Sequence, residues 1–165
     1  HAAHERIVYE ELKSRRAQGR VPSQKLLIPE TLEMNYKEKA TLERIIPELV
    51  KTGFEIEPFG GSTFVIKALP QILSEASASG IITDIVETMV RTGFKSGTGN
   101  VLDESLILMS CHSAIRANQV LTDRQMRGLL SQLDQCENRA HCPHGRPIWI
   151  TWAEKEIEKA FKRIV

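Results

Sequence analysis

The sequence lacks three features that would mark a function class directly. It has three cysteines, too few and too widely spaced for a disulfide framework, which favours a reducing compartment with free or metal-bound thiols. Its formal net charge of +1 provides no general basic field of the kind that attracts nucleic acid. No apolar run is long enough to span a membrane, and no signal peptide is recognisable. These absences leave an ordinary soluble composition, with 41% hydrophobic and 26% charged residues.

The length of 165 residues is enough for one domain with a substantial core or for two small subdomains. No internal repeat or low-complexity segment is present. The chain begins at His1 within a helical pattern, so we expect it to be a piece of a longer protein.

Apolar periodicity predicts a mixture of helices and short strands. Helices are expected over about 1–18, 37–51, 80–91, 103–115, 122–134 and 151–163. Strands are expected at 24–29 and 148–150, and a hairpin over 54–69 that turns at Gly60-Gly61. Residues 95–100, rich in glycine and serine, are expected to form a mobile loop.

Prolines and capping residues set the expected ends of these elements. Pro29 should stop the first strand, and Pro47 should kink the second helix or split it in two. Thr122 with Gln125 is a capping box that begins the helix over 122–134. Thr151 with Glu154 is a second capping box, which predicts the start of the last helix.

The segment Cys142-Pro143-His144-Gly145-Arg146-Pro147 combines two metal-ligand side chains with residues that fix the backbone. Pro143 biases Cys142 toward an extended conformation, in which side chains two residues apart point the same way. A thiolate and an imidazole suit zinc, but one pair cannot close a site, so other ligands must come from elsewhere. The alternative is a buried thiol beside a surface histidine in a proline-rich turn.

Other candidate ligands are ambiguous by themselves. His1 and Glu5 lie four residues apart, so they share a helix face and form either a two-ligand edge or a solvated helix end. Cys111 lies on or beside an apolar helix face, where a free cysteine usually packs as a small hydrophobic residue. A grouping of Cys136 with Cys142 and His144 matches none of the usual spacings of structural zinc sites.

Three separated segments resemble one family. Residues 1–10 resemble the endonuclease motif Asp-Gln-His-Ala-x-x-Glu-x-x-x-x-Glu of MutL-type mismatch-repair proteins. Residues 110–116, Ser-Cys-His-Ser-Ala-Ile-Arg, resemble that family's Ala-Cys-x-x-Ala segment with serine in place of the first alanine. Residues 142–147 resemble its Cys-Pro-His-Gly-Arg-Pro motif, and the order and spacing also match. The resemblance covers essentially the whole chain, as the carboxy-terminal domain of such a protein.

The resemblance implies that ligands from all three motifs converge on one or two divalent metals, Zn²⁺ and/or Mn²⁺. The implied metal ligands are His1, Glu5, Cys111, Cys142 and His144. His4, His112 and His141 fall outside this pattern and are expected to be surface or supporting residues.

The resemblance further implies a metal-dependent endonuclease that nicks one strand of duplex DNA. His1, Glu5 and Arg146 would be the catalytic residues, and Arg146 would contact a phosphate or pair with an acid in its loop. Adenine-nucleotide binding would belong to an amino-terminal domain outside this sequence. The motif's leading Asp-Gln and a strand pair would precede His1, so we expect this stretch by itself to be metal-poor or inactive.

The segment Gln24-Lys25-Leu26-Leu27-Ile28-Pro29 is similar to the short motif with which MutL-family nucleases engage the replication sliding clamp. The clamp-binding residues would be Gln24, Leu27, Ile28 and Pro29. The alternative is an edge strand that ends at a proline. Docking requires Gln24, Leu27 and Ile28 to face solvent.

We therefore expect an α/β (α+β) fold with two interleaved subdomains, in which small mixed sheets pack with helices. Residues 1–22 and 103–165 would form an inner subdomain with the metal site and the dimer surface, and 23–102 an outer, regulatory α/β subdomain.

The expected partners are a second copy of the chain, duplex DNA, the sliding clamp and the mismatch-recognition protein, with no membrane. A bacterial protein of this kind would be cytoplasmic and associated with the nucleoid. The alternatives are a non-catalytic dimerisation module with a structural zinc site, and an unrelated zinc-binding interaction domain.

Overall fold

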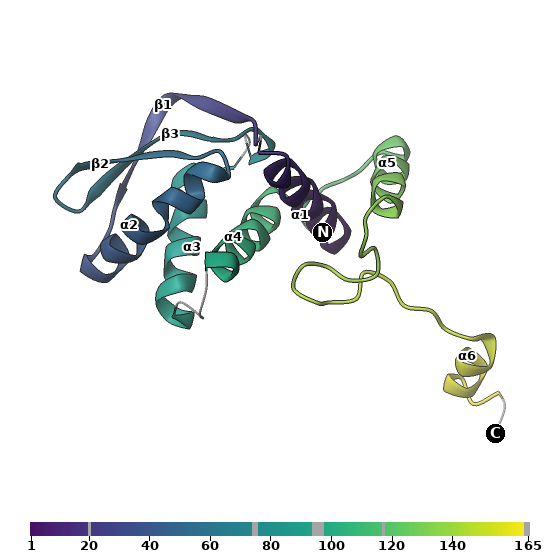
Figure 1. The fold of residues 1–165 in the computed structure, drawn as a ribbon. Helices are drawn as coiled ribbons and strands as arrows, with labels where there is room; N and C mark the ends of the chain where they lie inside the picture. The colour runs from purple at the N-terminus through teal and green to yellow at the C-terminus, as the bar shows by residue number, and fades with distance from the viewer. Residues whose placement is uncertain (20, 74–75, 94–97, 117, 164–165) are drawn as a thin grey trace.

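The computed structural model describes residues 1–19, 21–73, 76–93, 98–116 and 118–163, which form helices around one small sheet (Figure 1). The elements in chain order are α1 (Ala2–Ala17), β1 (Ser23–Glu33), α2 (Tyr36–Lys51), β2 (Glu55–Gly60), β3 (Thr63–Pro70), the 3₁₀ turn η1 (Gln71–Leu73), α3 (Ala78–Thr92), α4 (Thr98–Ser113), α5 (Asp123–Asp134) and α6 (Glu154–Ala160). The predicted α+β class is confirmed. No helix in the described ranges is long and apolar enough to cross a bilayer.

The sheet is antiparallel, with strand order β1-β3-β2 among the described residues. The predicted hairpin is confirmed, since β2 and β3 pair across the turn at Gly60-Gly61, where both glycines have positive φ. Phe64, Ile66 and Ala68 of β3 are buried, as expected for alternate residues on the covered face of a sheet. Helices α2 and α3 lie along that side (Figure 1).

Strand β1 continues through Pro29 to Glu33, so the predicted stop at this proline was wrong. Lys25 pairs with Ala68 and Glu30 with Ile66, which leaves residues 26–29 bulged opposite Lys67 alone. Pro29 therefore lies in an unpaired bulge of an edge strand, where its missing N–H removes no ladder hydrogen bond.

Two helices also differ from their predicted bounds. Helix α2 runs unbroken through Pro47, because Leu42, Ile45 and Leu49 are all buried in the same core on both sides of it. Helix α4 begins at Thr98 instead of Asp103, within the segment expected to be a mobile loop. The remainder of that expected loop, residues 95–97, lies outside the described residues.

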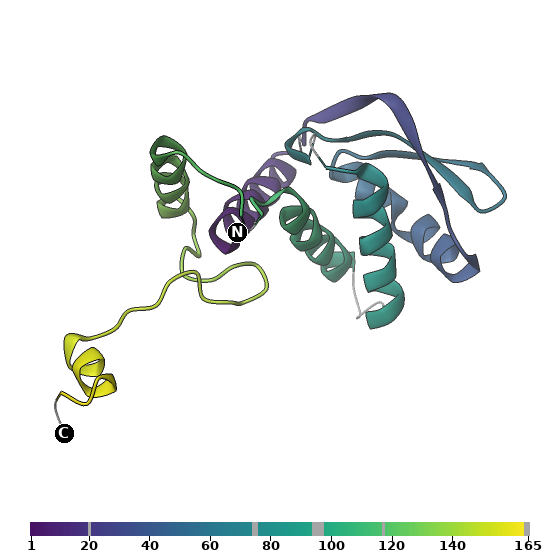
Figure 2. The same ribbon diagram turned by 180° about the vertical axis from the view of Figure 1, so that it is seen from behind.

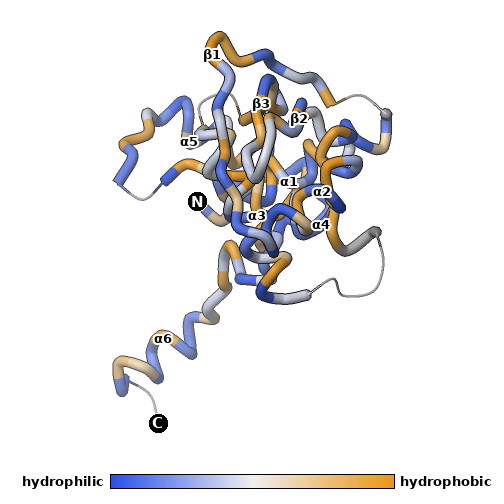
Figure 3. Tube along the Cα trace, turned by 90° about the vertical axis from the view of Figure 1, so that its left-hand side faces the viewer, coloured by the Kyte–Doolittle hydropathy of each residue, from blue (hydrophilic) through white to orange (hydrophobic). Residues whose placement is uncertain are grey.

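After α5, which begins at the predicted Thr122–Gln125 capping box, the carboxy-terminal segment departs from expectation. The strand predicted at 148–150 is absent, because no described strand lies beside it to complete a ladder, and the isolated bridge joins His141 to Pro147. Helix α6 is shorter than predicted, and its N-cap residue is Ala153, whose N–H donates to Glu156 Oε2 at 2.8 Å. The capping box predicted at Thr151 was therefore wrong. Figure 3 shows α6 projecting away from the body of the chain.

One hydrophobic core connects most of these elements. It includes Val8 and Leu12 of α1, Phe64 and Ile66 of β3, and Leu106 of α4 together with buried residues of α2 and α3. Helix α1 lies between α4 and α5 in both views of the ribbon (Figures 1 and 2). The division of the chain into inner and outer subdomains stays a prediction.

The β1 bulge is followed by a carboxylate that caps α3. Glu30 Oε2 accepts from Ser79 N at 2.8 Å, and its Oε1 accepts from Ala78 N at 3.3 Å. Burial by itself would raise the pKa of Glu30, but hydrogen bonds from Ser79, Ala78 and Ser77 outweigh it and hold the pKa below its usual value. This carboxylate thus joins the edge strand to the start of α3.

We predict that Glu30→Gln lowers the free energy of unfolding at pH 7 by about 1 kcal/mol, the usual cost of losing a charged cap. Because the folded-state pKa is lowered, the stabilisation is present above the ordinary value of 4.5 and is lost as pH falls through the folded value. Urea denaturation should show the difference between parent and variant closing in acid. Glu33→Gln, on the exposed side of the same strand, is the control; an equal effect there would contradict the capping role.

Candidate functional site

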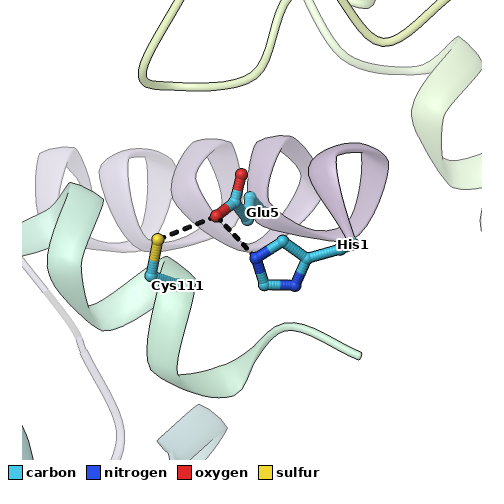
Figure 4. Close-up of side chains that lie close together, drawn as sticks. All are labelled: His1, Glu5 and Cys111. Atoms are coloured by element: carbon cyan, nitrogen blue, oxygen red, sulfur yellow. Dashed lines mark hydrogen bonds and ion pairs between the residues drawn. The ribbon is translucent and has the colours of Figure 1, made fainter. Parts of the chain in front are cut away.

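The candidate metal centre is built from two helices and one loop. His1 and Glu5 lie one turn apart at the start of α1, and Cys111 lies in the last turn of α4. Figure 4 shows these three side chains pointing toward one another. Cys142 and His144 come from the loop that follows α5.

The Glu5 carboxylate is the centre of this cluster and is almost fully buried, with 4% of the residue exposed. Its Oε1 accepts a hydrogen bond from Cys111 Sγ at 2.8 Å and lies 3.0 Å from His1 Nε2 (Figure 4). Its Oε2 lies 3.8 Å from His144 Nδ1. One carboxylate therefore contacts donors from α1, α4 and the loop.

The loop is closed by its own backbone. Cys142 N donates to the Arg146 carbonyl at 2.8 Å, and Gly145 N donates to the Cys142 carbonyl at 2.9 Å. Gly145 has φ of +83°, a conformation that favours glycine and turns the chain back. The turn buries the Cys142 side chain and places His144 Nε2 3.6 Å from Cys111 Sγ.

All five predicted ligand residues are thus brought together. The ligand atoms of His1, Glu5 and Cys111 lie within 4.8 Å of one another, and so do those of Glu5, Cys142 and His144. Two thiols, two imidazoles and a carboxylate form a donor set that fits zinc, and the carboxylate oxygen also suits manganese. The convergence is found, whereas metal binding itself stays a prediction.

The Cys111 thiol is protonated in this arrangement. Burial raises its pKa to about 12, with further contributions from the hydrogen bond and charge of Glu5, while the Arg146 guanidinium acts in the opposite direction. A cation bound here would have to displace the proton that Cys111 now shares with Glu5. Arg146 itself is exposed, close enough for its charge to act on this thiol.

Hydrogen bonds fix the position of His1 and of two histidines outside the ligand set, His4 and His112. His1 Nδ1 lies 2.9 Å from the Ile115 carbonyl, an arrangement that leaves Nε2 directed at Glu5. His4 Nδ1 accepts from Ile115 N at 3.0 Å, and burial lowers the pKa of His4. His112 Nε2 lies 2.7 Å from Asp84 Oδ2 and joins α4 to α3.

Two positioning residues, Arg6 and Glu10, were missed by the sequence analysis. Arg6 is buried and donates from Nε to the His141 carbonyl at 2.7 Å. Glu10 accepts from Glu137 N at 2.7 Å and from Asn138 N at 3.1 Å. Together they hold the segment before the Cys142 loop against α1. Glu10 is the final glutamate of the first motif, and this match was the sequence feature that could have identified it.

The remaining candidates lie apart from this cluster. Cys136 is in a hollow of about 690 Å³ between α1 and α5, where burial raises its pKa to about 11. The predicted clamp residues lie on β1, with Leu27 99% and Ile28 78% exposed and Gln24 and Pro29 also exposed. Their exposure agrees with the expectation for a docking segment, and clamp binding stays a prediction.

Comparison with known proteins places this geometry in context. A family model described as the MutL C terminal dimerisation domain matches residues 1–121. The chain is 39% identical over 164 residues to the DNA mismatch repair protein MutL of Citrifermentans bemidjiense, covering 99% of this chain and 25% of that protein. It is 40% identical over 163 residues to MutL of Geotalea uraniireducens, covering 99% and 27%. The chain thus spans about a quarter of the length of these relatives.

We predict that Cys111→Ser weakens zinc binding at least about tenfold, because it removes a soft ligand from the centre. Competition with a chromophoric chelator measures the affinity. Cys136→Ser is the matched control, since this thiol is also half-buried but lies outside the cluster. Equal losses in the two variants would contradict the assignment. The zinc affinity of the parent chain should fall as pH falls, because zinc binds Cys111 only after its thiol has lost the proton.

Proposed function

This chain belongs to the MutL family of DNA mismatch-repair proteins, as its C-terminal dimerisation domain, and on that premise we propose that it carries a metal-dependent endonuclease site that nicks one strand of duplex DNA. The observation that supports the proposal is the convergence of donors from three separated motifs on the Glu5 carboxylate. A buried carboxylate needs charged or hydrogen-bonding partners, and a cluster of titratable side chains of this kind is a candidate functional site.

A divalent cation, when bound, would activate water and stabilise charge on a phosphodiester. His1, Glu5, Cys111, Cys142 and His144 are the residues that would hold it. The exposed Arg146 guanidinium is placed to bind a phosphate oxygen beside the centre. Arg6 and Glu10 keep the loop that carries Cys142 and His144 in register with α1.

The rival is a non-catalytic dimerisation module with a structural zinc, which the thiol and imidazole donors would also suit. Structural zinc sites are closed, whereas catalytic sites keep one position open to water or substrate. The side chain of His144 is 35% exposed. This open side of the cluster favours the catalytic proposal.

Homodimerisation fits the family and the exposed apolar surface. Met126 and Leu130 are exposed on α5, and Trp149, Ile150 and Trp152 are exposed in the segment that leads to α6. Apolar surface of this kind marks interaction sites. Sedimentation equilibrium should show a species of twice 18.6 kDa, and an 18.6 kDa species alone would contradict the dimer.

The exposed β1 bulge supports clamp binding as a second role. Leu27 and Ile28 project from an edge strand at the one place where four residues leave the ladder. An apolar pair outside the core, beside an exposed Gln24, is what a docking segment requires. Duplex DNA, the mismatch-recognition protein and a cytoplasmic location remain proposals of the same kind.

We predict that the chain extended by Asp-Gln before His1 nicks supercoiled plasmid in the presence of manganese. Glu5→Gln should reduce the rate by roughly a hundredfold or more, because the central carboxylate is lost. Glu87→Gln, an exposed acid on α3, should leave the rate unchanged. Bound zinc without nicking would support the structural rival. Absence of both bound zinc and nicking would contradict the proposal.

We predict that replacing Gln24, Leu27 and Ile28 by alanine abolishes binding to an immobilised sliding clamp while fold and zinc content stay unchanged. Phe59→Ala, an exposed apolar residue of β2, is the control. Surface plasmon resonance measures the binding. The docking role is wrong if the triple variant unfolds or binds as well as the parent.

A further inference from the structure

A polar groove adjoins the candidate metal centre. Two neighbouring hollows of about 560 and 400 Å³ share His4, Ile115 and Gln119 in their walls. Together they extend from the start of α3, past the start of α1 and the end of α4, and along α5 as far as Gln132. We refer to the two hollows together as the arginine groove, after Arg116 and Arg124, which line its two parts.

The groove adjoins the candidate centre through Ile115. Ile115, which lines both parts, is bonded through its carbonyl to His1 Nδ1 at 2.9 Å and through its N–H to His4 Nδ1 at 3.0 Å. The same backbone segment therefore fixes a candidate metal ligand on one side and forms the wall of the groove on the other. A chain lying in the groove would pass beside His1.

The electrostatics of the groove suit a polyanion. Among its described lining residues there is no aspartate or glutamate. Within the described part of the chain neither Arg116 nor Arg124 forms an ion pair, so both guanidinium groups are available. By contrast, the hollow that contains Cys136 is lined by Glu10, Glu11 and Glu137.

Two acids near the groove, Asp84 and Glu30, have partners. Asp84 is paired with His112 at 2.7 Å, and Glu30 accepts the N–H groups at the start of α3. Their negative charge is partly offset by these contacts. Gln119, Gln125 and Gln132 add neutral polar side chains along the walls. Among the described residues that line the groove, the arginines Arg116 and Arg124 carry the unpaired charge.

We propose that the arginine groove binds the sugar-phosphate backbone of duplex DNA and leads one strand to the centre at His1 and Glu5. Arginine forms bidentate hydrogen bonds with phosphate, and such contacts position a duplex without reading its sequence. The inference rests on the proposed nuclease function and deepens it, because it names the residues that hold the substrate outside the metal centre.

The test is fluorescence anisotropy of a labelled duplex with the full 165-residue chain over a range of salt concentrations. The combined variant Arg116→Gln and Arg124→Gln should lose roughly tenfold or more in affinity for each arginine, as for other lost charge-assisted hydrogen bonds. The slope of log affinity against log salt should fall by about two. The double variant Arg116→Lys and Arg124→Lys should keep most of the salt dependence of the parent, because both positive charges are kept.

A charge-matched control is the double variant Lys37→Gln and Arg91→Gln. Lys37 is exposed on α2, and Arg91 is exposed in the last turn of α3. Zinc content and thermal unfolding of all variants show whether the fold and centre persist. Equal DNA affinity in the groove and control variants would overturn the proposal. So would binding of a poly-aspartate peptide as tight as that of DNA. Groove-dependent binding, together with no plasmid nicking by the chain extended by Asp-Gln, would support the groove and contradict the nuclease function.

Discussion

The buried carboxylate of Glu5 is the constraint on which the site depends. A carboxylate removed from water is costly unless charged or hydrogen-bonding groups surround it. Glu5 satisfies this requirement with Cys111 from α4, His1 from its own helix and His144 from the loop. Any change that separates these elements leaves a buried charge without partners. The packing of α1, α4 and the loop is therefore coupled to the chemistry of one side chain.

Further hydrogen bonds attach the segments around Glu5 to one another. Arg6 and Glu10 attach residues 137–141 to α1, His4 attaches the end of α4, and His112 joins α4 to α3. Helix α1 thus has the metal-ligand cluster and the arginine groove at its start, and an acidic hollow along its later turns. The candidate metal centre and the proposed DNA path share one backbone segment at Ile115.

Elements with strong local signals could be predicted from the sequence, including the hairpin at Gly60-Gly61 and the start of α5 at Thr122. The passage of β1 through Pro29 and the absence of a strand at 148–150 could not, because each depends on the strand that lies alongside. The five clustered residues were predicted through three motifs taken together, since each pair by itself allowed a structural alternative. The roles of Arg6 and Glu10 depend on tertiary contacts with the loop.

The central claim is that thiols from α4 and the loop join the carboxylate and imidazoles in one metal centre. X-ray absorption at the zinc edge of the zinc-loaded chain tests it most directly. The account predicts sulfur neighbours at about 2.3 Å, from Cys111 and Cys142, together with nitrogen or oxygen neighbours at about 2.0 Å. Substitution of Cys111 should reduce the sulfur contribution, and substitution of Cys136 should not. A zinc environment of nitrogen and oxygen alone would contradict the account.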